Sequence, residues 1–148
     1  MNPKFWMLVF FSCFATLAVG QITLEQKDII ARNLDPMPGK AIVYVIRHSG
    51  YAFLVTMEIG CDSSHIGSVG AEEYVYTVLD PGKHTFISST ENKCELETML
   101  EAGKIYYIKL QVNFGVFFPV TKLKLLSEER GKKYLNECKL ANDNTYSN

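Results

Sequence analysis

Residues 41–46 read Ala-Ile-Val-Tyr-Val-Ile, an uninterrupted apolar run with several β-branched side chains. Side chains along a strand point alternately to its two faces, so a strand formed by this run is apolar on both faces. A short run of this kind is typical of a strand buried on both sides. It predicts a central strand of a β-sandwich.

The chain beyond this run alternates apolar and polar residues in short segments separated by turn residues. In segment 51–59, for example, Tyr51, Phe53, Val55, Met57 and Ile59 would share one face. In the turn after Leu79, proline followed by glycine suits a type II turn, in which the glycine adopts a positive φ. This turn predicts that segment 84–89 returns as the partner strand of segment 72–79. The remaining predicted strands are 65–69, 93–100, 105–112 and 116–126.

Two segments have helical features. Residues 23–34 suit a short helix capped by Thr23 and ended by the proline-rich segment 35–39. Ser127, followed by two glutamates, suits the start of a second helix. The predicted fold is mainly β: a single antiparallel sandwich of about seven or eight strands with a C-terminal helix, after a cleaved signal peptide.

The composition excludes several classes of protein. The 148 residues are 47% hydrophobic, 12% aromatic and 21% charged, with a formal net charge of −1. This apolar content is too high for a disordered chain. Because there is no excess of basic residues to neutralise phosphates, we expect no nucleic-acid partner.

The N-terminal segment has the features of a secretory signal peptide. Lys4 precedes an apolar run from Phe5 to Gly20, and the chain turns polar directly afterwards. Small residues precede the junction, so cleavage is predicted after Gly20. An uncleaved anchor and a lipoprotein acylated at Cys13 are the alternatives. The predicted organisation is a signal peptide (1–20), a lead-in segment (21–39), the sandwich domain with its helix (40–141) and a flexible tail (142–148).

Export would place the chain in an oxidising compartment, where disulfides persist. Cleavage after Gly20 removes Cys13 and leaves Cys61, Cys94 and Cys138. The alternation places Cys61 and Cys94 on core-facing sides of their strands, and a bridge between them is the favoured pairing. Two unpaired buried thiols, or a bridge to Cys138, are the alternatives.

Other candidate sites have weaker support in the sequence. No paired-ligand motif joins Cys61 to His48, His65 or His84, and no nucleophile motif is present, so we expect neither metal nor cofactor nor enzymatic activity. Phe114, Phe117 and Phe118 cluster near a glycine and a proline. They form either a strand entering the core or an exposed apolar patch for a partner.

Several short motifs occur in a fixed order within residues 39–141. They are Gly39–Tyr44, Ile66-Gly67, Pro81–Thr85, Glu101–Tyr107, Glu129–Gly131 and Cys138–Leu140. In this order they resemble the bacterial exported family called domain of unknown function 2846, many of whose members resemble small lipoproteins. The turn at Pro81–Thr85 also resembles PEGA-type β-sandwich modules. The resemblance implies a β-sandwich at the cell envelope and carries over no catalytic residues. The chain departs from the family in lacking a good lipobox cysteine.

These observations predict a secreted or periplasmic, non-enzymatic module with a binding or structural role at the cell envelope. Its partner would be a protein or another envelope component, with membrane contact only through lipidation or an uncleaved signal. One alternative is an envelope lipoprotein tethered through Cys13. The other is a small hydrolase or metal-binding protein, which requires a histidine to meet a cysteine or an acid.

Overall fold

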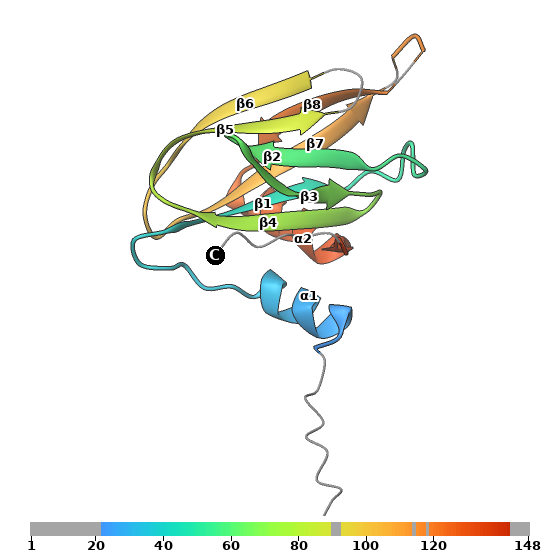
Figure 1. The fold of residues 1–148 in the computed structure, drawn as a ribbon. Coiled ribbons are helices and arrows are strands. Elements are labelled where there is room, and N and C mark those ends of the chain that lie inside the picture. The colour runs from blue at the N-terminus through green and yellow to red at the C-terminus, as the bar shows by residue number, and fades with distance from the viewer. Residues whose placement is uncertain (1–21, 90–92, 114, 118, 143–148) are drawn as a thin grey trace, which may run out of the picture.

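The computed structural model describes residues 22–89, 93–113, 115–117 and 119–142. These residues form nine strands in two sheets, with two helices beside them (Figure 1). The predicted signal peptide and its cleavage after Gly20 lie outside the described residues, as does the tail beyond Asn142. Among the described residues, no helix has the length and apolar character needed to span a membrane.

One sheet has five strands in the order β8-β7-β1-β4-β9. Their bounds are β1 Ala41–Arg47, β4 Glu73–Leu79, β7 Ile105–Asn113, β8 Val120–Leu125 and β9 Lys139–Leu140. β1 pairs with β4 antiparallel and with β7 parallel, and β9 joins β4 in parallel. The prediction of a purely antiparallel sandwich was therefore wrong. Alternating side chains are compatible with either strand direction, so the pattern alone could not exclude the parallel pairs.

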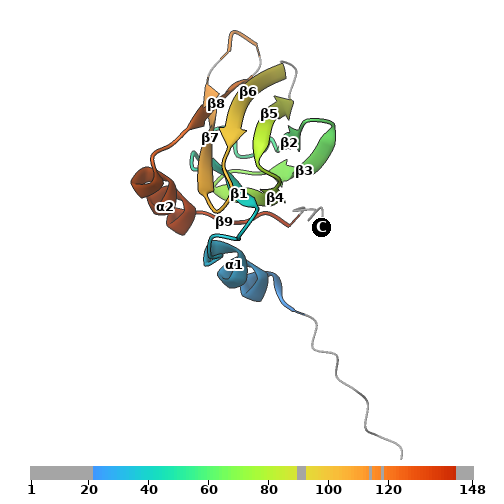
Figure 2. The ribbon, with the colours of Figure 1, turned by 90° about the vertical axis from the view of Figure 1, so that its left-hand side faces the viewer.

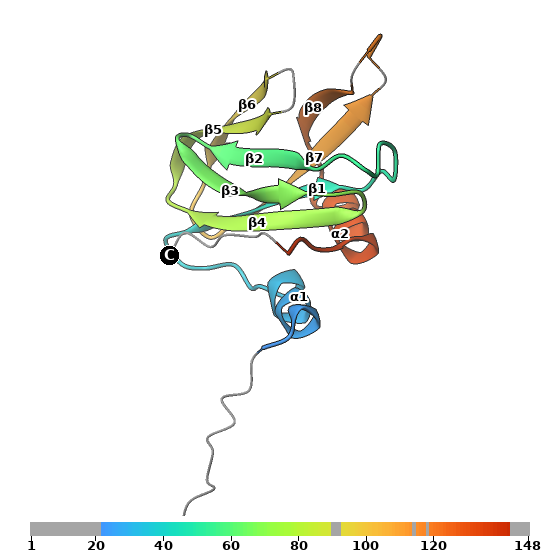
Figure 3. The same cartoon turned by 45° about the vertical axis from the view of Figure 1, so that its right-hand side comes forward.

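The other sheet has four antiparallel strands in the order β3-β2-β5-β6. Their bounds are β2 Met57–Cys61, β3 Ser64–Val69, β5 Gly82–Ser89 and β6 Lys93–Leu100. β4 and β5 belong to different sheets, so the predicted pairing of segments 72–79 and 84–89 was wrong. Gly82 does adopt the expected positive φ, at 138°, but the turn carries the chain from one sheet to the other (Figure 3).

The two sheets enclose the main hydrophobic core. Alternate residues of β1, among them Val43 and Val45, cluster there with Ile108 of β7 and with Ile59 and Phe86 of the other sheet. Burying this apolar area is the dominant favourable contribution to folding. The mainly β architecture with two sheets agrees with the prediction.

A second core lies on the outer face of the five-stranded sheet, where both helices pack (Figure 2). The helices are α1, Leu24–Arg32, and α2, Glu128–Glu137. The other side chains of β1, including Tyr44, contact Ala31 of α1 and Leu135 of α2 in this cluster. The helices thus explain why every residue of β1 is buried.

Helix α1 is integrated into the domain through hydrogen bonds as well as apolar contacts. Its N-terminus has a capping box between Thr23 and Gln26, which confirms Thr23 as the cap. The hydroxyl of Tyr44 donates to the carbonyl of Ala31 at 2.6 Å. Arg32 donates to the carbonyls of Leu135, Asn136 and Cys138, where the last turn of α2 has no basic residue of its own. The segment treated as a lead-in therefore includes an element that packs on the sandwich.

The segment before β2 differs from its prediction. Residues 51–54 form turns, Ala52 has a φ of 53°, and the strand begins only at Met57. Phe53, predicted to share the apolar face, is 71% exposed. Val55 is also exposed, so the predicted apolar face is correct for Met57 and Ile59 and wrong for Phe53 and Val55. The turns keep the chain before Met57 from pairing as a strand.

Candidate functional site

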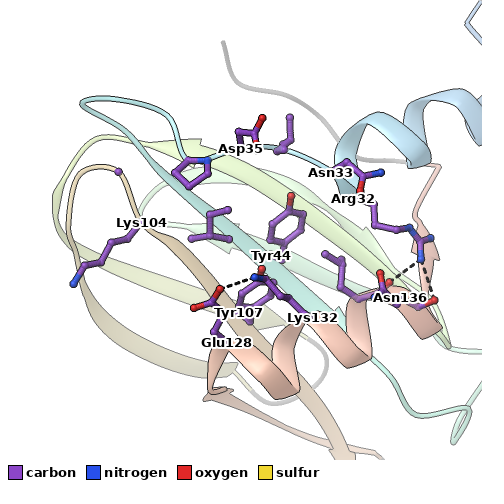
Figure 4. Close-up of a pocket in the computed structure, with 14 residues that line it drawn as sticks. Arg32, Asn33, Asp35, Tyr44, Lys104, Tyr107, Glu128, Lys132 and Asn136 are labelled. Atoms are coloured by element: carbon purple, nitrogen blue, oxygen red, sulfur yellow. Dashed lines mark hydrogen bonds and ion pairs between the residues drawn. The ribbon is translucent and has the colours of Figure 1, made fainter.

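A cleft of about 570 Å³ lies on the helix side of the five-stranded sheet (Figure 4). Its walls are the loop that follows α1, the beginning of β7 and one side of α2. This volume falls within the range of about 300–1,000 Å³ typical of small-molecule sites. The sequence analysis missed the cleft because it exists only when α1 and its loop pack against the sheet.

Two tyrosines from adjacent parallel strands form the floor of the cleft. The rings of Tyr44 and Tyr107 stack with centroids 5.5 Å apart and planes within 10°. They are 1% and 3% exposed, so only their edges reach the cleft. Burial raises the pKa of Tyr107 above its usual value. Ile105 and Leu135 add apolar surface beside the rings.

Charged side chains surround this floor. Lys132 pairs with Glu128 at 2.6 Å and Lys104 pairs with Glu101 at 2.7 Å, and both lysine side chains are more than half exposed. Ion pairs this exposed contribute only about 0–1 kcal/mol, so either ammonium can turn toward a bound anion at small cost. Arg32, by contrast, is held by the end of α2 and by Asp28.

A second group of chemically active side chains lies at one end of β2 and β5, the two central strands of the four-stranded sheet. Cys61 ends β2, Asp62 follows it in the turn, and His84 lies on β5. His84 Nδ1 is 3.9 Å from Cys61 Sγ and 2.8 Å from an oxygen of Asp62. In the part of the chain that the structure describes, this is the group in which three potential metal ligands lie within 4.8 Å of one another.

The hydrogen bonds of His84 favour the protonated form of its ring. Its Nε2 lies 2.9 Å from the carbonyl oxygen of Asp80, while Nδ1 faces the carboxylate of Asp62. Burial opposes the charged ring, but the hydrogen bonds to Asp62 and Asp80 outweigh it and raise the pKa of His84. Because both partners accept hydrogen bonds, the ring donates from both nitrogens when it is protonated.

The predicted bridge between Cys61 and Cys94 does not form, and the cysteines of the described segments are all unpaired. β5 lies between β2 and β6, and its register places Cys61 opposite Phe86 but Cys94 opposite Ser88. Two strand spacings alone amount to about 9.6 Å. A disulfide requires Cα atoms about 4.4–6.8 Å apart. Alternation correctly predicted that both face the core, but it contains no information about the strand between them.

The other predicted candidates lie apart from this group. His48 pairs with Glu137 and stacks on Tyr134, and His65 lies 3.4 Å from Glu58. All three histidines therefore meet an acid, as the hydrolase or metal-binding alternative requires, and within the described segments His84 is the one that also lies beside a cysteine. Asp62 was not among the residues that the sequence singled out.

The predicted apolar patch is described only in part. Phe117 is 87% exposed, as is its neighbour Val116 at 90%. Phe114 and Phe118 lie outside the described residues. For Phe117 the exposed alternative is correct, because the chain turns between β7 and β8 instead of continuing as a strand.

The chain matches no protein-family model. An uncharacterized protein of Haemophilus influenzae is 26% identical over 128 residues, which cover 86% of this chain and 76% of that protein. The chain is thus similar, over most of its length, to a protein from a bacterium.

Proposed function

We propose that the protein is an exported, non-enzymatic module of the bacterial envelope that binds a small anionic ring compound in the cleft between the α1 loop and α2. The observation that carries this proposal is the stacked pair Tyr44 and Tyr107 in a cleft that Lys132 and Lys104 also line. Lys132 lies beside Tyr107, whereas Lys104 points away from the rings and would have to turn to reach a bound anion (Figure 4). The described residues lining this cleft include no histidine, cysteine or serine. The cleft therefore offers no serine or cysteine paired with a histidine, the arrangement on which most nucleophilic catalysis depends.

The cleft favours a ligand with two distinct parts. A flat ring can pack on the tyrosine edges, Ile105 and Leu135, which removes apolar surface from water. An anionic substituent can then take charge-assisted hydrogen bonds from Lys104 and Lys132. Each such bond contributes about 1.5–3 kcal/mol when it is shielded from water.

Anilinonaphthalene sulfonate is a suitable probe, because it combines a flat aromatic part with an anionic group. We expect its fluorescence to rise on binding to the full chain. The double variant Lys104→Gln, Lys132→Gln should weaken binding about tenfold or more, the equivalent of about 1.4 kcal/mol. A fluorescence titration gives both dissociation constants.

Two control variants separate the cleft from other surfaces. Lys83→Gln removes an exposed lysine that pairs with Glu97 on the other sheet, and binding should not change. Phe117→Ser removes exposed apolar surface that does not line the cleft and should also leave the affinity intact. Equal affinity for the double variant and the wild type, or loss of binding in Phe117→Ser, would contradict the proposed site.

The envelope location is tested separately by the intact mass of the protein from its native host. We expect a mass that begins at Gln21, because the apolar run and the small residues before this position suit signal peptidase. A mass that begins at Cys13 and includes acyl chains would support the tethered alternative. A mass that corresponds to a chain beginning at Met1 would contradict both the cleaved and the lipid-tethered forms.

A further inference from the structure

The group formed by Cys61, Asp62 and His84 is held together by the backbone of two strands. The N–H of Asp62 donates to the carbonyl of Thr85 at 2.8 Å, and the N–H of Thr85 donates to a carboxylate oxygen of Asp62 at 2.9 Å. These two hydrogen bonds fix Asp62 beside β5. Its other carboxylate oxygen faces His84.

The geometry does not suit a cysteine nucleophile activated by histidine and aspartate. That arrangement needs the nucleophile at one ring nitrogen and the orienting acid at the other. Here Cys61 and Asp62 both face Nδ1 of His84, while Nε2 is occupied by the carbonyl of Asp80. A sulfur, an oxygen and a nitrogen instead surround one common point.

We propose that Cys61, Asp62 and His84 bind a zinc ion at this point. Thiolate, carboxylate and imidazole are the ligands that zinc takes in proteins. Zinc bonds of about 2.0–2.3 Å in tetrahedral geometry place ligand atoms about 3.4–3.6 Å apart. The observed separations of 2.8 Å from Nδ1 to the carboxylate oxygen and 3.9 Å from Nδ1 to Sγ lie on either side of this range. Small side-chain rotations would therefore complete the site.

The surroundings already orient the ligands. Histidines that bind zinc usually donate their other ring N–H to a carbonyl or carboxylate, and Asp80 supplies that carbonyl here. Thr85 orients the carboxylate of Asp62 in the same way. The site is thus organised before an ion enters.

Zinc binding would release protons and leave one coordination position open. Cysteine binds zinc as the thiolate, so the Cys61 thiol would lose its proton when the ion binds. A cleft of about 310 Å³ borders all three side chains. Three protein ligands leave a fourth position for a water or a small ligand entering from this cleft.

Cobalt(II) is a direct probe, because it replaces zinc and its bond to a thiolate gives a charge-transfer absorption. The full chain is purified without a histidine tag, treated with a chelator under reducing conditions and titrated with Co²⁺. We expect one equivalent to bind with thiolate charge-transfer and tetrahedral absorption, and Zn²⁺ to displace it. No thiolate absorption in the wild-type protein would overturn the proposal.

Variants assign the ligands. Cys61→Ala should abolish the charge-transfer absorption, and His84→Gln should weaken zinc binding at least tenfold. Asp62→Asn should also weaken zinc binding at least tenfold. This variant can retain the hydrogen bond from Thr85, and asparagine tolerates the positive φ of 55° at this position.

Cys138→Ala, which removes another buried thiol, is the matched control and should keep the spectrum. Thermal unfolding of each metal-free variant checks that it folds. Charge-transfer absorption that survives in Cys61→Ala, or unchanged zinc affinity in folded Asp62→Asn, would refute this assignment.

Discussion

Arg47→Met is expected to lower the free energy of unfolding by about 4 kcal/mol, the largest effect of any single substitution considered for this domain. Arg47 ends β1 and is fully buried. Its guanidinium donates to the carbonyls of Tyr51, Ala52, Val55 and Val69. Methionine fills a similar volume but leaves these carbonyls without their donor. Urea denaturation of the two proteins measures the difference.

The same substitution should loosen the turns at residues 51–55. Three of the four accepting carbonyls lie in this segment, so the guanidinium is what holds it against the end of β1. Limited proteolysis should therefore cut near Phe53 faster in Arg47→Met than in the wild type. Arg130→Met, on the exposed face of α2, is the control and should change the stability by less than about 0.5 kcal/mol. Equal stability of the two variants would show that the buried guanidinium has no structural role.

Gly131→Ala is expected to destabilise the domain by about 3 kcal/mol, although alanine is the better helix former. Gly131 lies in α2 where the helix contacts β7. A Cβ at this position would lie 2.1 Å from Cγ and 2.5 Å from Cβ of Tyr107. These atoms adjoin the backbone of β7, so rotation of the ring cannot remove the overlap and the helix itself must move. Thermal unfolding should show a Tm lower by roughly 10 °C.

A second glycine provides the matched control for this prediction. A Cβ at Gly50 would meet the carboxylate of Glu72 at 3.6 Å, which is an ordinary contact. Gly50→Ala should therefore change the free energy of unfolding by less than about 1 kcal/mol. If Gly131→Ala were as stable as Gly50→Ala, the close packing of α2 on Tyr107 would be wrong. Because Tyr107 also forms the floor of the proposed cleft, Gly131→Ala should weaken binding of anilinonaphthalene sulfonate as well.

Several elements could be predicted from the sequence because local geometry alone decides them. Period-two alternation indicated most of the strands, and Thr23 correctly indicated the start of a helix. Ser127 does precede α2, but its side chain makes no capping hydrogen bond. Period-two alternation and helix signals act within a few residues, so they appear directly in the sequence.

The candidate sites could be predicted much less well. The sequence favoured Cys61 as half of a disulfide, showed no motif that joins it to a histidine, and did not single out Asp62. His84, 22 residues beyond Asp62, joins them because β2 and β5 pair in one particular register. The register between β2 and β5 cannot be inferred from the spacing of residues within either strand. An alternating strand can pair with several neighbours without changing which of its side chains face the core.

The sequence by itself determined that the domain is mainly β and that residues 41–46 are buried on both faces, because alternation and apolar content are properties of the chain alone. Only the tertiary structure decided what covers each face: the second sheet on one side, and α1 with α2 on the other. It also decided that the turn at Gly82 joins two sheets and that Arg47 is buried among carbonyls. These outcomes depend on contacts between segments that are distant in the sequence. Such contacts stabilise the fold only after the strands have paired and the helices have packed.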